Sequence, residues 1–192
     1  IGALTERLEG EKIGIIGLGG TGGYILDQKA KTPVDQIHLF DGDTFLQHNA
    51  FRAPGAPSID QLRAAAPKVE YFASIYSHMH RGIVPHVVDL GASNVYLLDG
   101  ITFAFLSMDA GDAKRAVVAK LEAMGVSFID VGMGLELVDG SLGGILRVTA
   151  STPAKRDHVH NGRISFHSAP ADAVYATNIQ VADLNMLNAA LA

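Results

Sequence analysis

The sequence predicts an α/β fold in which helices cover both faces of a mostly parallel sheet. Short apolar runs alternate with segments of helical periodicity over residues 12–131, as expected for repeated strand–helix units. One of these runs, Phe103–Ser107, shows no polar alternation, which is typical of a parallel strand buried on both faces. The first run is followed directly by a glycine-rich turn, a common start for such a fold.

The first half of the chain supplies two clear strands and two helical segments. Lys12–Ile16 is apolar and stops at glycine, so we expect a buried strand there, followed by a helix over residues 23–30. A second strand is expected over Gln36–Phe40. The apolar spacing of residues 59–77 predicts one continuous helix.

The next elements continue the alternation. A third strand is expected over residues 83–88, where Pro85 interrupts the pattern. After the buried run at 103–107, residues 111–124 predict a helix that Gly125 closes, because glycine commonly follows the last helical turn. A fifth strand follows over residues 126–131.

Beyond residue 131 the rhythm changes to antiparallel signals. Residues 135–137, 144–149 and 163–166 predict short strands, the first two joined around the hairpin sequence VDGSLGG. Residues 151–162 are polar and predict a mobile loop, and residues 175–192 predict a final amphipathic helix. The expected architecture is a Rossmann-like, mostly parallel sheet with helices on both faces, C-terminal antiparallel strands and a final helix.

Composition limits the function classes. The 192 residues, 48% of them hydrophobic and 18% charged, suit one globular domain over residues 1–192. A net charge of −5 does not favour a nucleic-acid partner. The absence of cysteine excludes a thiolate zinc site and a cysteine nucleophile, and it fits a cytoplasmic location, so no structural zinc is expected.

No apolar run reaches the roughly 18 residues that a membrane helix needs, so no membrane partner is expected. The chain begins at Ile1 and ends inside a helical pattern, so we expect a part of a longer protein.

Five glycines fall within Gly17–Gly23, although each glycine inside an element costs roughly 0.5–1 kcal/mol relative to alanine. A strand, the pattern Gly17-x-Gly19-x-x-Gly22 and then a helix is typical of a turn whose backbone N–H groups bind a nucleotide phosphate. Asp41 ends the second strand, where an acid commonly accepts hydrogen bonds from ribose hydroxyls.

The residues that follow distinguish a triphosphate from a nicotinamide cofactor. Asn49, Arg52 and Lys68 supply polar and cationic groups suited to phosphates, and Asp109 follows the buried strand with a carboxylate suited to Mg²⁺. Hydride transfer from a nicotinamide requires neither the cationic pair nor the added acid. An NAD-dependent oxidoreductase and a non-catalytic nucleotide-binding scaffold nevertheless stay open as alternatives.

Four blocks, GLGGTGG, DGDTFLQHNAFR, PKVE and FLSMD, occur in the order of the signature of the ThiF/MoeB-type adenylating enzymes. The chain therefore resembles this family, which is related to the ubiquitin-activating enzymes. The resemblance implies ATP and Mg²⁺ as cofactors and a homodimer. It also implies an adenylyltransferase that activates the C-terminal carboxylate of a ubiquitin-like or sulfur-carrier protein, or of a peptide, as an acyl-adenylate with release of pyrophosphate.

The resemblance assigns roles by position. The catalytic residues that it implies are Arg52, Lys68 and Asp109, with Asp109 as the Mg²⁺ ligand. The nucleotide-binding residues that it implies are Gly17, Gly19, Gly20, Gly22, Asp41, Asp43, Asn49, Arg52 and Lys68. Ala53 and Ala110 stand where the family often has glutamine and asparagine, and the family's paired CxxC motifs are absent. Without cysteine, no thioester step is expected in this stretch.

Several residues keep two interpretations. Asp43 is either a second ribose or metal contact or a turn residue of the DGD sequence. Asp130 is a candidate contact for the tail of the carrier, and Gly132 and Gly134 either line the path of that tail or form a sharp strand exit. Lys114 follows Asp109 within reach of a phosphate, but an exposed helix face is the favoured interpretation.

Overall fold

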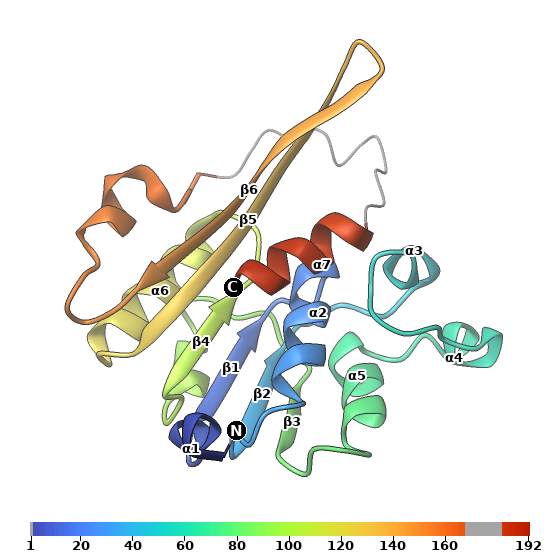
Figure 1. Ribbon diagram of the computed structural model, residues 1–192, viewed down its shortest axis with the longest axis horizontal. Coiled ribbons are helices and arrows are strands. Elements are labelled where there is room, and N and C mark those ends of the chain that lie inside the picture. The colour runs from blue at the N-terminus through green and yellow to red at the C-terminus, as the bar shows by residue number, and fades with distance from the viewer. Residues whose placement is uncertain (1, 168–181) are drawn as a thin grey trace.

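The computed structural model describes residues 2–167 and 182–192. Its six strands form one sheet in the order β3-β2-β1-β4-β5-β6 (Figure 1). The strands are β1 (Lys12–Ile16), β2 (Gln36–Phe40), β3 (Ile83–His86), β4 (Phe103–Leu106), β5 (Ser127–Val138) and β6 (Ser141–Ser151). The first five are parallel and β6 is antiparallel to β5, which confirms the predicted Rossmann-like fold class.

The helices fill the connections between strands. They are α1 (Gly2–Thr5), α2 (Gly20–Lys29), α3 (Gln47–Ala50), α4 (Ile59–Ala64), α5 (Lys68–Tyr76), α6 (Asp112–Ala123) and α7 (Ala182–Leu191). Shorter helical turns are η1 (Glu6–Leu8), η2 (Val95–Leu98) and η3 (Val159–Arg163). The final helix predicted over residues 175–192 is present from Ala182, and its first part lies outside the described residues.

Two hydrophobic clusters lie on opposite faces of the sheet. On one face, alternate strand residues such as Ile15 and Leu39 pack against α2, α5 and α7. On the other face, Ile16, Leu106 and Phe128 pack against α6 and η2. Because successive strand residues point to opposite faces, this even division explains why the strands contain continuous apolar runs.

The predicted helix over residues 59–77 is wrong as one element. It is divided into α4 and α5, because Ala65 takes a left-handed conformation with φ of 46° and Pro67 begins the next helix. Proline disfavours helical geometry in the residue before it and cannot donate a backbone hydrogen bond. The break lets Lys68 begin a helix of its own, with its backbone N–H donating to the carbonyl of Asp43 at 2.8 Å.

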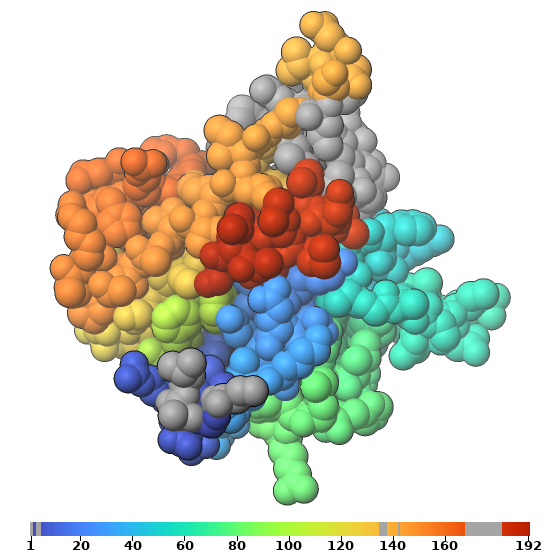
Figure 2. Space-filling view, in the orientation of Figure 1, coloured from blue at the N-terminus to red at the C-terminus, as the bar shows by residue number. Residues whose placement is uncertain are grey.

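The C-terminal hairpin is longer than the sequence predicts. β5 pairs with β4 only as far as Asp130, and then continues with β6 alone to a two-residue turn at Asp139 and Gly140. Both turn residues have positive φ, as a tight hairpin requires. Figure 2 shows that the tip of this hairpin stands out from the body of the molecule.

The segment after β6 also differs from the prediction. No strand forms over residues 163–166. The predicted loop 151–162 contains a bridge between Thr152 and Lys155 and the single turn η3, in which Val159 is fully buried. An apolar side chain that packs under α6 therefore fixes a segment whose composition is polar.

Among the described residues, no helix has the length and apolar character that crossing a bilayer requires.

A pair of histidines on β2 and β3 predicts a pH-dependent stability. His38 Nδ1 lies 3.0 Å from His86 Nε2, and burial lowers the pKa of both rings below the ordinary value of 6.5, with His86 as a further cause for His38. Protonation of these histidines is therefore less favourable in the folded state than in the unfolded state. The free energy of unfolding is thus expected to be unaffected by them above about pH 6.5 and to fall as the pH drops below that value. Denaturant unfolding at pH 7.5 and 5.5 checks this.

His86→Phe, which retains the stacking on Phe40 at 4.4 Å, is expected to reduce this pH dependence. An equal loss of stability on acidification in the variant and in the unchanged chain would contradict the assignment.

Candidate nucleotide-binding site

The glycine turn lies at the carboxyl end of β1, in the middle of the sheet. Gly17 leaves the strand with φ of +87°, its N–H donates to the carbonyl of Phe40 at 2.8 Å, and its carbonyl accepts from Ser107 Oγ. A Cβ atom at Gly17 would lie 2.7 Å from the Ser107 carbonyl oxygen. The turn therefore packs against the first residue after β4, and a side chain at this position does not fit.

Different contacts explain why several positions of the turn have no side chain. A Cβ at Gly22 would lie 2.0 Å from the carbonyl oxygen of Gly17, and one at Gly20 would lie 2.4 Å from the side chain of Asn185 on α7. A Cβ at Gly19 meets nothing within 4 Å. Protein contacts therefore explain Gly17, Gly20 and Gly22, whereas Gly19 faces open space.

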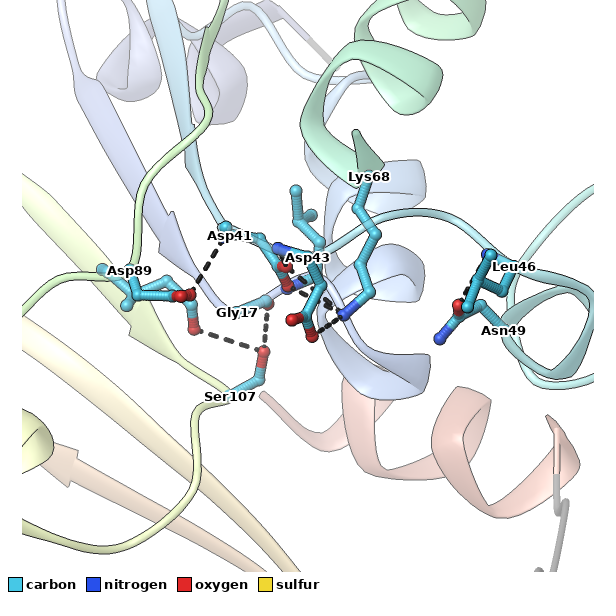
Figure 3. Close-up of polar contacts among 11 residues, drawn as sticks. Gly17, Asp41, Asp43, Leu46, Asn49, Lys68, Asp89 and Ser107 are labelled. Atoms are coloured by element: carbon cyan, nitrogen blue, oxygen red, sulfur yellow. Dashed lines mark hydrogen bonds and ion pairs between the residues drawn. The ribbon is translucent and has the colours of Figure 1, made fainter. Parts of the chain in front are cut away.

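Asp41 and Lys68 form the buried ionic centre of the site (Figure 3). The Asp41 carboxylate accepts from the backbone N–H of Leu18 at 2.7 Å and of Asp43 at 2.9 Å, and it lies 3.3 Å from Lys68 Nζ. Lys68 also pairs with the exposed carboxylate of Asp43 at 2.6 Å. The side chains of Asp41 and Lys68 are only 8% and 7% exposed, so this pair fixes the end of β2 relative to the start of α5.

Asn49 and Arg52 lie beyond this pair, and the residues around them line a cavity that is open to solvent. The Asn49 Oδ1 atom accepts from the backbone N–H of Leu46 at 2.8 Å, which leaves its amide NH₂ available as a donor. The Nε atom of Arg52 is buried without a hydrogen-bond partner among the described residues. A cavity of about 220 Å³ is lined by Asp43, Thr44, Leu46, His48, Asn49, Arg52 and Lys68.

The predicted residues thus meet in one place for the most part. The glycine turn contacts Asp41 through Leu18, Asp41 contacts Lys68, and Lys68 lines the cavity together with Asn49 and Arg52. Asp43 takes part in the turn, since its backbone N–H donates to Asp41, and its side chain pairs with Lys68 and lines the cavity. A contact of Asp43 with ribose or metal stays a prediction. An unpartnered buried guanidinium donor is unfavourable in a folded protein, so the cavity favours an anionic occupant.

Asp109 lies on the exposed loop that follows β4. This loop begins at Ser107, which contacts Gly17, so Asp109 is at the same edge of the sheet as the glycine turn. Among the described residues, no three histidine or acidic side chains gather in a metal cage. Because Mg²⁺ at nucleotide sites is bound through one or two carboxylates together with phosphate oxygens, a single exposed carboxylate fits it.

Sequence reasoning missed two buried asparagines on α7. Asn185 Oδ1 accepts from the hydroxyl of Thr21 at 2.9 Å, and Asn188 Nδ2 donates to the carbonyl of Gly132 at 3.3 Å. The sequence predicted this helix as amphipathic, but its buried side carries Asn185 and Asn188, whereas Leu187 and Leu191 are exposed. Two asparagines three residues apart were the available signal, since buried amides require partners.

The interpretation of Lys114 as part of an exposed helix face is wrong. Its side chain is 4% exposed, and Nζ lies 2.7 Å from the carboxylate of the fully buried Asp130. Asp130 is also paired with Arg147 at 2.6 Å, so its carboxylate is not available to the tail of a carrier.

No protein-family model matches the chain, and no curated protein matches it. The structure of Escherichia coli MccB with AMPCPP and MccA matches with a TM-score of 0.70 and 16% identity, over 98% of this chain and 55% of that one.

Two further solved structures match over a shorter part. The E. coli tRNA N6-threonylcarbamoyladenosine dehydratase TcdA, solved in complex with ATP, matches with a TM-score of 0.59 and 20% identity, over 71% of this chain and 57% of that one. PaaA matches with a TM-score of 0.59 and 21% identity, over 68% and 40%. The chain spans about half the length of these structures, and it has the fold that its resemblance to the ThiF/MoeB-type adenylating enzymes implied.

Proposed function

We propose that the chain binds ATP with Mg²⁺ and transfers the adenylyl group to a carboxylate, releasing pyrophosphate. One observation carries the proposal: Arg52, whose Nε is buried without a partner among the described residues, and Lys68 line one cavity, and Lys68 also pairs with Asp41, which accepts from Leu18 of the glycine turn. Cationic and N–H donors at one end and a buried carboxylate at the other match the phosphates and the ribose of a nucleotide.

Each residue of the site has a role in this proposal. Asp41 accepts from the ribose hydroxyls, and Gly19 admits the nucleotide to the backbone. Arg52, Lys68 and the amide of Asn49 bind the phosphates and offset the negative charge that develops on the leaving pyrophosphate. Such a site accelerates the reaction mainly by positioning and by electrostatic stabilisation, because the protein forms no covalent bond itself.

Asp109 is the residue that would hold Mg²⁺ at the edge shared with the glycine turn. When bound, Mg²⁺ supplies positive charge to phosphate oxygens. Asp109 is exposed and follows Ser107, which contacts Gly17, by two residues, and this supports the assignment.

The acyl substrate in this proposal is the C-terminal carboxylate of a ubiquitin-like protein, a sulfur-carrier protein or a peptide. A complex of MccB with MccA has been solved, and TcdA is named for a modified tRNA, so the structural neighbours differ in this respect. We favour a protein or peptide tail because the net charge of −5 does not suit tRNA. The proposal also includes a homodimer and a cytoplasmic location, both taken from the sequence and its resemblance.

ATP–pyrophosphate exchange in the presence of candidate carrier proteins or peptides tests the function. We expect exchange that requires Mg²⁺ and a free C-terminal carboxylate, and ATP–Mg²⁺ binding that NAD does not displace. Tight binding of NAD without an effect of ATP would favour an oxidoreductase instead. Binding of ATP without exchange for any carrier would favour a scaffold.

Alanine at Gly19 is expected to weaken ATP binding without changing stability, whereas alanine at Gly22 is expected to lower stability. Gly19→Ala should change the free energy of unfolding by less than about 0.5 kcal/mol, because its Cβ meets open space and its φ of −64° suits alanine, yet it should weaken ATP binding at least about tenfold. Gly22→Ala should destabilise the chain by about 1–3 kcal/mol, because its Cβ overlaps the Gly17 carbonyl.

Urea unfolding and ATP titration of both variants check these expectations. Unchanged ATP affinity in a folded Gly19→Ala chain would contradict the approach of the nucleotide to this position.

A further inference from the structure

A second group of charged side chains lies on the sheet face that α6 covers, away from the cavity. Asp130 of β5 has no exposed side-chain surface, and it pairs with Lys114 of α6 at 2.7 Å and with Arg147 of β6 at 2.6 Å. Two cations thus surround one carboxylate. The cluster Lys114–Asp130–Arg147 carries one positive charge in excess, and α6 and the β5–β6 pair supply its members (Figure 1).

The hydrogen-bonding capacity of Arg147 is not exhausted by Asp130. Its Nη2 donates to the carboxylate, whereas its Nε is buried without a hydrogen-bond partner among the described residues. The side chain is 31% exposed, so part of the guanidinium is accessible from solvent. Since guanidinium carries five N–H donors, an anion that approaches from the exposed side can still be bound.

One face of the Arg147 guanidinium packs closely on β5, so an anion approaches it from the exposed side. A Cβ on the paired residue Gly132 would lie 2.6 Å from Nη2, so the guanidinium lies directly over a strand position that has no side chain. Lys114 belongs to the first turn of the 12-residue helix α6, whose N-terminus carries no side-chain cap. The partial positive charge of that helix end adds to the cationic character of the cluster.

Strand register places the cluster near the proposed reaction site. Ile16 of β1 pairs with Leu106 of β4, and Leu106 pairs with Asp130 of β5. Asp130 is therefore two strands from the residue that precedes Gly17, or about 10 Å at a strand spacing of about 4.8 Å. About three residues of an extended chain, at roughly 3.3–3.6 Å each, cover that distance.

We propose that Arg147 binds a carboxylate of the acyl substrate. The inference rests on the proposed function, because adenylation brings a carboxylate to a phosphate and both are negative. Arg52 and Lys68 lie on the phosphate side, and Lys68 already faces two carboxylates, so a separate cation lowers the repulsion on the acyl side. The carboxylate is an acidic side chain within the last few residues of the tail, because the C-terminal carboxylate itself has to reach the ATP about three residues further on.

NMR titration of the Arg147 Nε–Hε signal tests this binding without requiring turnover. The probes are acetyl-glycylglycine, with only a terminal carboxylate; acetyl-aspartyl-glycinamide, with only a side-chain carboxylate; and acetyl-glycylglycinamide, with neither. We expect a saturable shift with the second probe, a weaker one with the first and none with the third. No shift with the second probe, or an equal shift with the first or the third, would overturn the proposal.

Variants separate binding from a structural role. Arg147→Gln should raise the dissociation constant of the effective probe about tenfold and Arg147→Lys less, because a charged hydrogen bond is lost in one and a charge is retained in the other. Lys155→Gln, which removes an exposed cation paired with Asp157, serves as the matched control with unchanged affinity. Equal probe affinity in Arg147→Gln and the unchanged chain would refute the role.

ATP affinity, measured in the same variants, should stay within twofold. Loss of probe binding with intact ATP binding supports the inference even where exchange fails. Exchange with an unchanged KM for the acyl substrate in Arg147→Gln overturns the inference but leaves the proposed function in place.

Discussion

Replacing Asp130 with asparagine is expected to lower the free energy of unfolding by about 3–5 kcal/mol, which is the range measured when one partner of a buried ion pair is removed. The variant leaves Lys114 buried with 4% of its side chain exposed and without a carboxylate. Arg147 loses the same partner. Chemical denaturation monitored by circular dichroism measures the effect.

The same helix provides a matched control. Lys120, also on α6, pairs with Asp99 at 2.6 Å, but the side chain of Asp99 is 64% exposed. Asp99→Asn should therefore cost less than about 1 kcal/mol, because water screens an exposed ion pair and solvates the remaining lysine. A similar loss of unfolding free energy in Asp130→Asn and Asp99→Asn would show that burial does not determine how much the Lys114–Asp130–Arg147 cluster stabilises the fold.

Asp109→Ala is expected to reduce pyrophosphate exchange by about 100-fold or more, equivalent to about 2.7 kcal/mol in the barrier. The reason is that Asp109 offers the exposed carboxylate at the sheet edge that bears the glycine turn. Exchange is measured at saturating ATP and Mg²⁺, and the affinity for ATP without Mg²⁺ is measured separately. That affinity should stay within about threefold, because the ribose and phosphate contacts of the proposal do not involve Asp109.

Asp112→Ala is the control for this variant. Asp112 lies three residues further on, in the first turn of α6, and is fully exposed with a single weak pair to Arg115 at 3.7 Å. It should retain exchange within about threefold. Exchange that survives in Asp109→Ala, or that falls equally in Asp112→Ala, would remove the assigned role of Asp109.

The fold could be predicted because its signals are local. Apolar runs that end at glycine or aspartate mark β1 and β2, and the same positions carry the turn and Asp41 of the site. The errors arose where neighbouring residues do not decide the outcome. Pro67 divided a periodic pattern into two helices, and pairing with β6 extended β5 through Val138.

The candidate site was predictable only in part for the same reason. Asn49, Arg52 and Lys68 could be named from their order, but the unpartnered Nε of Arg52 and the contacts of Lys68 with two carboxylates depend on tertiary packing. The pairing of Lys114 with Asp130, and the contact of Asn185 with Thr21, join segments that no periodicity connects.

The contact between Thr21 and Asn185 spans 164 positions of the chain, and Asn185 also fills the space that a side chain at Gly20 would occupy. During synthesis on the ribosome, the glycine turn emerges before α7 and gains this packing only after α7 has followed it. A prematurely terminated product that lacks α7 would therefore carry the glycine motif without its support.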